Sequence, residues 1–321
     1  MSGKRVLVIG GAGFIGSVLC PKLADLGYSV TVFDKKSKSE ADTTLDYVRG
    51  DVRDRKEVSN AMVARDLVYN LAAEHQDNVR PLSLYMEVNV EGARNVCAAA
   101  TEHGVKHIVF TSSVAVYGSH ETPIGEDTPH LFFNEYGRTK HLAEQVHLEW
   151  LEGAADNQLT IVRPTVVFGP GNRGNVYNLL RQLKYGPFVM FGNGLNVKSL
   201  AHVENISSFL SFLAGRRERY GVYNYADKPD FNMRDLVRFV DRQLGKKDTR
   251  RARFPQGLGV LAGHVADGFS IVTGRSLPVS AVRVKKFCAS SAIDSRRAMA
   301  TGFVPPNELQ ASLQQMVNNH V

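Results

Sequence analysis

The sequence predicts an α/β protein built on a doubly wound parallel sheet, followed by a smaller C-terminal α/β lobe. Short uninterrupted apolar stretches alternate with amphipathic stretches of helical length, as in a parallel sheet that helices cover on both faces. A glycine-rich turn directly follows the first apolar stretch. After about residue 170 the alternation loosens, which predicts a first domain over residues 1–170 and a second lobe over residues 171–321. Strands or helices formed by residues after 170 can also pack as part of the first domain.

Each element is predicted from its own residue pattern. Continuous apolar runs predict strands over residues 5–9, 28–33, 47–50, 66–71, 107–111 and 159–163. Apolar residues at helical spacing predict helices over residues 14–26, 88–103, 136–151, 176–184 and 233–244. Gly27 ends the first of these helices.

Composition excludes several classes of protein. The chain has 43% hydrophobic and 22% charged residues, which is ordinary for a soluble globular protein. No stretch approaches 18 uncharged apolar residues and the N-terminus lacks the pattern of a signal peptide, so we expect a cytoplasmic protein without a membrane partner. Cys20, Cys97 and Cys288 are widely spaced, so we expect reduced thiols and no metal site.

The net charge of +7 is unevenly distributed. Residues 1–160 hold 16 Lys/Arg and 22 Asp/Glu, a net charge of −6, whereas residues 161–321 hold 23 and 10, a net charge of +13. Basic clusters at residues 216–219 and 246–251 could contact nucleic acid, but such runs are more often solvated helix ends and loops. A lobe that holds an anionic small molecule fits the asymmetry equally well, and we expect no nucleic-acid partner.

The glycine turn indicates a dinucleotide site and makes the predicted fold Rossmann-type. Gly10, Gly13 and Gly16 follow the first strand and open the first helix. There they allow a tight turn, a close approach of backbone to a pyrophosphate, and close packing of helix on strand. Asp34 ends the second strand, 18 residues after Gly16, where a carboxylate accepts hydrogen bonds from ribose hydroxyls and repels a 2′-phosphate. We therefore expect NAD rather than NADP, although the two lysines after Asp34 soften that repulsion.

Tyr136 and Lys140 are candidates for acid–base chemistry. Their spacing places both side chains on one face of the predicted helix. A lysine ammonium near a phenol favours the phenolate, so we expect a lowered tyrosine pKa, as a general base requires. Residues 111–113 (Thr-Ser-Ser) end the fifth strand, where a hydroxyl can hold a substrate oxygen beside the tyrosine.

Eight motifs in sequence order resemble those of one known family. They are GGAGFIG (10–16), Asp34, GDVRD (50–54), NLAAEH (70–75), NVEGARNV (89–96), TSSVAVYG (111–118), YGRTK (136–140) and RPTVVFGPG (163–171). The segment at 192–206 also resembles that family's sugar-nucleotide segment. Over nearly its whole length the chain resembles the extended short-chain dehydrogenase/reductases, in particular the NAD-dependent nucleotide-sugar epimerases and dehydratases.

The resemblance implies NAD as cofactor, a nucleoside diphosphate sugar as substrate of the C-terminal lobe, and a homodimer formed through the helices at 88–103 and 136–151. By motif match, Ser113 is the catalytic hydroxyl, Tyr136 the base and Lys140 its activator. The expected cofactor-binding residues are Gly10, Gly13, Phe14, Ile15, Gly16, Asp34, Asp51, Val52, Leu71, Ala72, Ala73 and Lys140. The expected substrate-binding residues are His75, Asn175, Asn178 and Lys198. His75 is as readily a residue that forms hydrogen bonds within its loop.

The chain departs from the family pattern at two places, and the first of them narrows the range of expected reactions. Val114 and Ala115 replace the Asp-Glu pair with which family dehydratases move protons, so 4,6-dehydration is not expected. Lys198 replaces the family's usual arginine in the sugar-phosphate segment. A lysine keeps the charge but loses the bidentate fork, which leaves the identity of the sugar open.

The leading hypothesis is an NAD-dependent epimerase of polysaccharide biosynthesis. It acts at C4 of a UDP-hexose or UDP-N-acetylhexosamine through a 4-keto intermediate. The alternative is a nucleotide-sugar 4-ketoreductase that uses NAD(P)H with the same three residues, and net consumption of NAD(P)H would separate the two. A non-catalytic dinucleotide-sensing protein is a third hypothesis. The intact set of Ser113, Tyr136 and Lys140 argues against it, since a sensor needs no polarised phenol.

Overall fold

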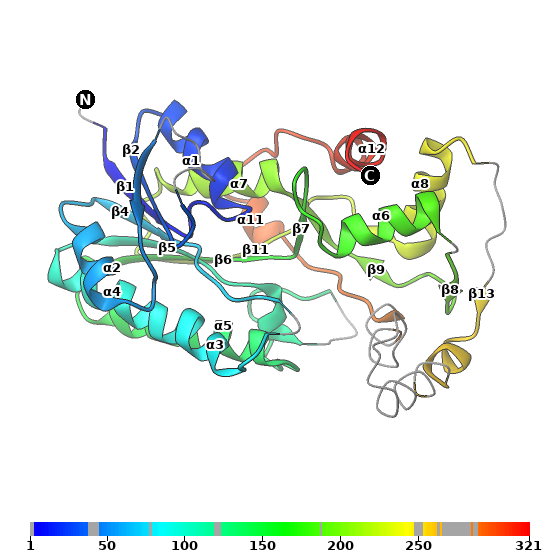
Figure 1. Cartoon of the computed structure of the whole chain (residues 1–321), viewed down its shortest axis with the longest axis horizontal. Coiled ribbons are helices and arrows are strands. Elements are labelled where there is room, and N and C mark those ends of the chain that lie inside the picture. The colour runs from blue at the N-terminus through cyan, green and yellow to red at the C-terminus, as the bar shows by residue number, and fades with distance from the viewer. Residues whose placement is uncertain are drawn as a thin grey trace.

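The computed structural model describes residues 3–37, 45–76, 79–118, 123–186, 188–246, 253–261 and 288–321, together with residues 264 and 284. Figure 1 shows a large sheet flanked by helices beside a smaller group of helices and short strands. The smaller group comes from the later part of the chain, as the loosened sequence pattern predicted. The division at residue 170 itself stays a prediction.

The predicted parallel sheet is confirmed. Seven strands pair in parallel in the order β11-β6-β5-β4-β1-β2-β3. They are β1 (Arg5–Ile9), β2 (Ser29–Asp34), β3 (Asp46–Arg49), β4 (Leu67–Asn70), β5 (His107–Thr111), β6 (Gln158–Pro164) and β11 (Tyr220–Tyr225). The order reverses between β1 and β4, and doubly wound sheets bind their ligands at the carboxyl ends of the strands beside such a point.

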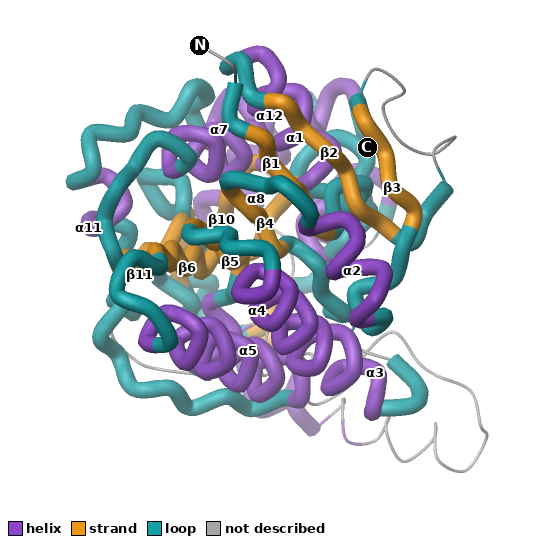
Figure 2. The backbone as a smooth tube through the Cα atoms, turned by 90° about the vertical axis from the view of Figure 1, so that its left-hand side faces the viewer, coloured by secondary structure: helices purple, strands orange, loops and turns teal. Residues whose placement is uncertain are grey.

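Helices cover both faces of this sheet (Figure 2). One face carries α1 (Gly16–Asp25) and α7 (Val203–Leu213). The other face carries α2 (Arg55–Met62), α4 (Gly92–Glu102) and α5 (Glu135–Glu152). Apolar side chains such as Leu23 and Phe209 pack on the first face, and Val96 and Ala143 pack on the second. The two apolar layers explain why the strands read as continuous apolar runs.

Most predicted boundaries lie within two residues of the observed ones, but the helix predicted over 88–103 is longer. Helical structure begins at Ser83 and passes through α3 (Ser83–Tyr85) and a π-helical stretch, η2 (Met86–Glu91), before α4. The amide of Leu84 donates to the carbonyl of Pro81 at 3.2 Å, so the first turn starts at a proline, where a missing N–H has no cost.

The helix α7 and two further elements of the sheet layer lie outside the prediction. Asp54 caps α2 by accepting from the amides of Lys56 at 2.9 Å and Glu57 at 3.0 Å. This Asp-x-x-Glu spacing is a helix-start signal that the sequence does contain. The second element is β11, which pairs along β6 after α7 has crossed the sheet. Residues 203–225 therefore rejoin the first domain.

The smaller part has its own apolar core. Its helices are α6 (Asn175–Tyr185), α8 (Met233–Gln243) and α12 (Leu309–Asn319). Its short strand pairs are β7 (Val166–Phe168) with β10 (Leu200–His202), β8 (Met190–Phe191) with β13 (Arg253–Phe254), and β9 (Val197–Lys198) with β12 (Phe231–Asn232). The helix α11 (Arg296–Met299) leads back along β11.

Two expectations about the whole chain can be compared with the structure. Among the described helices, none is both long and apolar enough to span a bilayer. The three cysteines are free thiols, as expected: Cys20 and Cys97 are buried and Cys288 is half-buried.

Candidate active site

The glycine turn brings the ends of β1 and β4 into close contact. Gly10 has a φ of +79°, and a Cβ atom built there would lie 2.8 Å from the backbone nitrogen of Ala72. The amide of Leu71 donates to the carbonyl of Ile9 at 2.9 Å, which holds the loop after β4 against the turn. A Cβ atom at Gly16 would lie 2.6 Å from the carbonyl oxygen of Gly10. Both glycines are therefore needed for backbone to lie this close to backbone.

Asp34 lies against this turn, where the sequence placed a ribose-binding carboxylate. Its carboxylate accepts hydrogen bonds from the amides of Ala12 and Lys36, both at 3.1 Å. The ammonium of Lys36 donates to the carbonyl of Ala12 at 3.0 Å. A positive charge thus lies beside the carboxylate, as the sequence suggested, and the preference for NAD over NADP stays a prediction.

The remaining expected cofactor residues differ in their surroundings. Four of them are half-buried: Gly13, Phe14 and Ile15 in the turn after β1, and Ala73 in the loop after β4. The Asp51 carboxylate binds the Arg53 guanidinium at 2.7 Å, and this hydrogen bond lowers the pKa of Asp51. Val52 is buried in the core beside Gly92. A contact from Asp51 or Val52 to an adenine ring stays a prediction.

The side chain of Ser113 lies beside that of Tyr136, and their interaction acts to lower the pKa of Tyr136. Asn134 caps α5 by accepting from the amide of Gly137 at 2.8 Å, which places Tyr136 in the first turn of the helix. A Cβ atom at Gly137 would overlap the carbonyl oxygen of Ala115. The glycine inside the YGRTK motif therefore lets the catalytic helix lie against the segment that carries Ser113.

Lys140 lies one turn further along α5 and is only 1% exposed. Its ammonium donates to the carbonyl of Thr111 at 2.6 Å and lies 4.2 Å from the centroid of the Phe110 ring. Burial lowers the pKa of Lys140 to about 7, against the upward effect of the Glu144 carboxylate. The lysine is therefore anchored to the end of β5, next to the segment that carries Ser113.

The expected lowering of the Tyr136 pKa is wrong for this arrangement. Burial raises the pKa of Tyr136 above its usual value, and the interaction with Ser113 opposes the rise without reversing it. Lys140 does not reverse it either, because its nitrogen is directed to the Thr111 carbonyl and burial disfavours its own charge. A phenol in these surroundings needs a further positive charge nearby to act as a base near neutral pH.

A buried ion pair supports the catalytic helix from behind. Arg163 on β6 donates from Nε and Nη2 to the two carboxylate oxygens of Glu144, at 2.8 and 2.6 Å. Burial acts to raise the pKa of Glu144, but the hydrogen bonds from Arg163 hold it below its usual value. Arg163 also donates to the Tyr117 hydroxyl at 2.7 Å, which donates to Asn224 at 2.7 Å. This network links α5, β6, β11 and the 3₁₀ helix η3 (Val114–Tyr117), and the sequence pattern did not predict it.

Asn89 is a second site residue that the sequence pattern did not predict. It lies in η2 and is 2% exposed. Its side chain accepts from the amide of Glu74 at 2.8 Å and donates to the Glu74 carbonyl at 3.1 Å and the Thr139 hydroxyl at 2.9 Å. Asn89 thereby joins the loop after β4 to the catalytic helix. Its place in the motif at 89–96 was the available signal, but one sequence does not reveal a contact with a loop 15 residues away.

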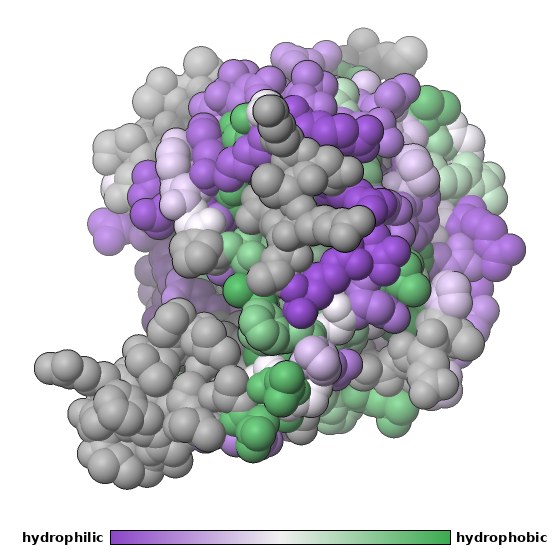
Figure 3. Space-filling model, turned by 90° about the vertical axis from the view of Figure 1, so that its right-hand side faces the viewer, coloured by the Kyte–Doolittle hydropathy of each residue, from purple (hydrophilic) through white to green (hydrophobic). Residues whose placement is uncertain are grey.

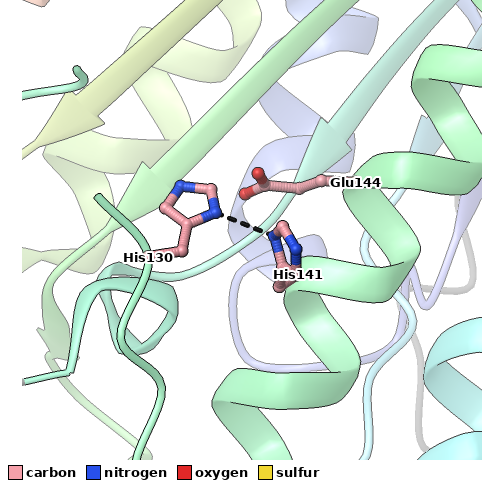
Figure 4. Close-up of side chains that lie close together, drawn as sticks. All are labelled: His130, His141 and Glu144. Atoms are coloured by element: carbon pink, nitrogen blue, oxygen red, sulfur yellow. Dashed lines mark hydrogen bonds between the residues drawn. The ribbon is translucent and has the colours of Figure 1, made fainter. Parts of the chain in front are cut away.

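Figure 4 shows His130, His141 and Glu144 gathered beside the catalytic helix. Their potential ligand atoms lie within 4.8 Å of one another, and the two Nδ1 atoms of the histidines are 2.8 Å apart. Both oxygens of Glu144 already accept from Arg163, whose charge would oppose a cation. We interpret the group as a hydrogen-bonded cluster, and the absence of a metal site stays a prediction.

The expected substrate residues lie on the loop after β4 and on the smaller part of the molecule. Asn175 begins α6 and Asn178 lies one turn later, and both are exposed. Lys198 on β9 donates to the carbonyl of Ala289 at 2.6 Å, and burial lowers its pKa to about 8. His75 is exposed in the loop after β4. Contacts from these four residues to a substrate stay predictions.

The arrangement of turn, carboxylate and catalytic residues agrees with a known family. The model of the NAD dependent epimerase/dehydratase family matches residues 6–226, which include the glycine turn, Ser113, Tyr136 and Lys140. The chain belongs to this family. The resemblance inferred from the eight motifs is thereby confirmed. The matched region ends at residue 226, so it includes β11, the last strand of the sheet.

Individual members of this epimerase/dehydratase family are similar over most of the chain. The N-acetyl-alpha-D-glucosaminyl-diphospho-ditrans,octacis-undecaprenol 4-epimerase of Escherichia coli O157:H7 is 46% identical over 313 residues, which are 97% of this chain and 93% of the relative. The UDP-glucose 4-epimerase of Bacillus subtilis (strain 168) is 30% identical over 294 residues, covering 85% of this chain and 78% of that enzyme. The solved structure of MoeE5 in complex with UDP-glucose and NAD superimposes with a TM-score of 0.74 at 25% identity, covering 98% of this chain and 97% of that one.

The turn has the features that an NAD pyrophosphate requires. A Cβ atom at Gly13 would lie 3.0 Å from the carbonyl of Gly10, and the start of α1 lies directly behind it. The first amides of a helix lack partners within it, so they can donate to phosphate oxygens. Asp34 lies on the far side of the same turn, where its carboxylate would meet the adenosine ribose. The residues present therefore fit the cofactor of the family.

Proposed function

We propose that this protein is an NAD-dependent 4-epimerase of a sugar linked to a diphosphate. The observation that carries the proposal is that the hydroxyl-bearing side chains of Ser113 and Tyr136 lie beside each other, with the buried Lys140 one turn further along α5. Val114 and Ala115 follow Ser113 and offer no group that moves a proton. The site can therefore exchange a proton with one sugar hydroxyl but has no pair of carboxyl groups for a dehydration.

The residues have distinct roles in such a reaction. Tyr136 accepts the proton of the C4 hydroxyl and later returns it to the C4 oxygen, and Ser113 hydrogen-bonds that oxygen throughout. Lys140 holds the nicotinamide ribose and the end of β5. The residues of the glycine turn and Asp34 would hold NAD, which would supply reversible hydride transfer at C4 and, in its oxidised form, the positive charge that Tyr136 needs. Oxidation and reduction use the same groups, so no further acid is required.

Two groups are candidates for the carrier, the part of the substrate to which the sugar is linked through the diphosphate. The relative with 46% identity is named for an undecaprenol-linked N-acetylglucosaminyl diphosphate, which favours a polyprenyl-diphospho-N-acetylhexosamine as substrate. The UDP-glucose 4-epimerase relative favours a UDP-hexose or UDP-N-acetylhexosamine, as the sequence predicted. Either carrier presents a diphosphate, and Asn175, Asn178 and Lys198 would bind it, with His75 near the sugar.

The remaining sequence expectations belong to the same proposal. We place the enzyme in the cytoplasm and in polysaccharide biosynthesis, with the part of residues 171–321 that lies outside the sheet domain as the lobe that binds substrate. We also propose a homodimer through α4 and α5, which pack side by side and run close to the protein surface (Figure 2). An epimerase leaves the ratio of NADH to NAD unchanged after each turnover, whereas a 4-ketoreductase would convert NAD(P)H to its oxidised form.

Product analysis on matched substrates tests the proposal. The purified protein is incubated with NAD and, in separate reactions, with UDP-glucose, UDP-N-acetylglucosamine and a detergent-solubilised polyprenyl-diphospho-N-acetylglucosamine. We expect NMR to detect the 4-epimer from at least one of them without net NADH formation. Net NADH formation, the reverse of ketoreduction, would point to the reductase. Tight NAD binding without turnover of any sugar would point to the sensor and overturn the proposal.

A further inference from the structure

We propose that the edge of the smaller part formed by Arg253, Phe254, Leu258 and Leu261 docks on an anionic lipid bilayer. This edge is called the docking edge below. The inference rests on the proposed function, because a polyprenyl-linked substrate stays in the membrane and its enzyme must work at the bilayer surface. It differs from the sequence-based expectation of no membrane partner, which considered only segments long enough to span a bilayer.

Three large apolar side chains of the docking edge are exposed to solvent. Phe254 is 46%, Leu258 54% and Leu261 61% exposed. Leu258 and Leu261 are three residues apart in a short helical stretch, so they lie on one face of it. Figure 3 shows the side of the molecule that carries this part, with hydrophobic residues gathered toward the bottom and hydrophilic residues above them. Exposed apolar groups gathered in this way mark interaction sites more often than scattered ones do.

The docking edge is held rigidly to the smaller part. β13 pairs with β8, and the amide of Gly192 donates to the carbonyl of Phe254 at 2.9 Å. A Cβ atom at Gly259 would overlap the ring of Phe191, so the helical stretch lies directly on that ring. The apolar side chains of the edge are therefore presented to solvent by a fixed backbone.

The same group of strands connects the docking edge to the candidate diphosphate site. The thiol of Cys288 donates to the carbonyl of Phe191 at 3.4 Å. The next residue, Ala289, accepts from the ammonium of Lys198 at 2.6 Å. Through these contacts Lys198, the candidate diphosphate ligand, is linked to the strand pair that bears Phe254. An exposed apolar surface on that side suits a lipid carrier and its bilayer.

The positive charge near the docking edge supports an anionic bilayer as the surface that binds there. Arg253 is exposed on the docking edge, and Arg242 is exposed at the end of α8. In sequence, residues 246–253 hold five Lys/Arg and one Asp, and the second half of the chain carries the +13 excess. Basic residues beside apolar ones are the usual means by which a protein binds anionic lipid at the interface.

Co-sedimentation with vesicles tests the inference without relying on turnover. The full chain is mixed with vesicles of phosphatidylethanolamine and phosphatidylglycerol, and separately with vesicles of phosphatidylcholine. We expect binding to the anionic vesicles that weakens at high salt, and at least about ten-fold weaker binding to phosphatidylcholine. A protein that stays in the supernatant with anionic vesicles would overturn the inference and leave a protein partner as the occupant.

Variants locate the binding on the docking edge. The triple change Phe254→Ser, Leu258→Ser and Leu261→Ser should reduce vesicle binding by about ten-fold or more. Each substitution removes apolar surface that the bilayer would bury. Arg253→Gln should reduce it by about five-fold on anionic vesicles alone. Leu26→Ser is the matched control, because Leu26 is also 61% exposed but lies at the end of α1 on the sheet domain. Equal binding by the triple variant and the control would contradict the inference.

Two further measurements separate this inference from the proposed function. Circular dichroism and NAD binding show whether the triple variant is folded. Turnover of a soluble UDP-sugar, where it occurs, should be unchanged in that variant. A protein that binds vesicles through this edge but turns over no diphosphate-linked sugar would refute the proposed function alone. A protein that epimerises sugars but binds no vesicles would refute the docking alone.

Discussion

The sheet domain and the smaller part hold their candidate site residues in opposite ways. In the sheet domain, Lys140 and Asn89 are almost fully buried, and Ser113 lies beside Tyr136. In the smaller part, Asn175 and Asn178 are exposed at the start of a helix. Tyr136 and Lys140 lie on an 18-residue helix and Ser113 lies two residues after β5, whereas Lys198 lies on a two-residue strand.

This difference indicates where chemistry and specificity reside. Groups that move a proton must keep their relative positions within a fraction of an ångström, which a packed core provides. Groups that choose the carrier can lie on short surface elements, because each adds little and can be exchanged without loss of the fold. Changes in the sheet domain should therefore affect turnover, and changes in the smaller part should affect substrate binding.

The largest expected effect is that of Tyr136→Phe. The variant removes the group proposed to take the C4 proton but keeps the ring, so kcat should fall by about 10²–10⁴-fold. The midpoint of thermal unfolding and the affinity for NAD should hardly change, because one hydroxyl contributes about 1 kcal/mol. Steady-state kinetics and an NAD titration measure both. A variant that keeps more than about a tenth of wild-type kcat would refute the role of Tyr136.

Gly137→Ala tests whether the close approach of helix and loop creates the site. The added methyl group would overlap the carbonyl of Ala115, so the first turn of α5 must shift and kcat should fall by up to about 10²-fold. Stability should change by less, since overpacking costs about 1–3 kcal/mol and alanine favours the helix by about 1 kcal/mol.

Gly125→Ala is the matched control for this effect. A Cβ atom at Gly125 would have no neighbour within 4 Å, so both kcat and the free energy of unfolding should stay near the wild-type values. Urea denaturation and kinetics on the two variants give the comparison. If Gly137→Ala behaved like Gly125→Ala, the tight contact would not be what positions Tyr136.

Asp34→Ala should weaken NAD binding by about 1–3 kcal/mol, through loss of a charged hydrogen-bond acceptor. NADP binding should be weakened far less, or even improve, because the carboxylate that repels its 2′-phosphate is gone and Lys36 remains beside the turn. Calorimetric titration of both cofactors into both proteins measures this. Equal losses for the two cofactors would show that Asp34 does not contact the ribose.

The smallest effect is expected at Lys198 and should appear in KM. Because burial lowers its pKa to about 8, the ammonium charge is present below that pH and lost above it. KM for a diphosphate-linked sugar should therefore rise as the pH passes through about 8, while kcat changes little. Lys198→Met should raise KM by roughly five-fold at neutral pH, the effect of about 1 kcal/mol at a partly exposed site.

Lys198→Arg provides the control for this pH dependence. Arginine stays charged throughout, so its KM should show no rise near pH 8. A rise that persists in the arginine variant would assign it to another group and remove Lys198 from the diphosphate site.

The sheet and the glycine turn could be predicted because their signals are local. A buried parallel strand reads as a continuous apolar run, and the spacing of Gly10, Gly13 and Gly16 is imposed by backbone sterics within one turn. The helix α2 also had a local signal, the Asp54 cap. The strand β11 had none, since Tyr220–Tyr225 mixes polar and aromatic residues and pairs with β6 more than 50 residues earlier.

The site's supporting contacts could not be predicted, because they depend on where distant segments meet. Asn89 reaches Thr139 across 50 residues, and Tyr117 reaches Asn224 across 107. The direction of the Tyr136 pKa was predicted wrongly for the same reason. The spacing in YGRTK places lysine and tyrosine on one face, but the burial that raises this pKa depends on how the whole fold packs around the phenol.

The sequence by itself determined the fold class and the glycine turn and proposed Ser113, Tyr136 and Lys140 as catalytic residues, because strand patterns, turn sterics and motif spacing are properties of neighbouring residues. Only the tertiary structure decided that Lys140 points to the Thr111 carbonyl, that Arg163 and Glu144 support α5, and that Phe254 and Leu261 are left exposed. Burial and long-range contacts are properties of the packed chain, and they set both the charge state of the site and the surface it presents.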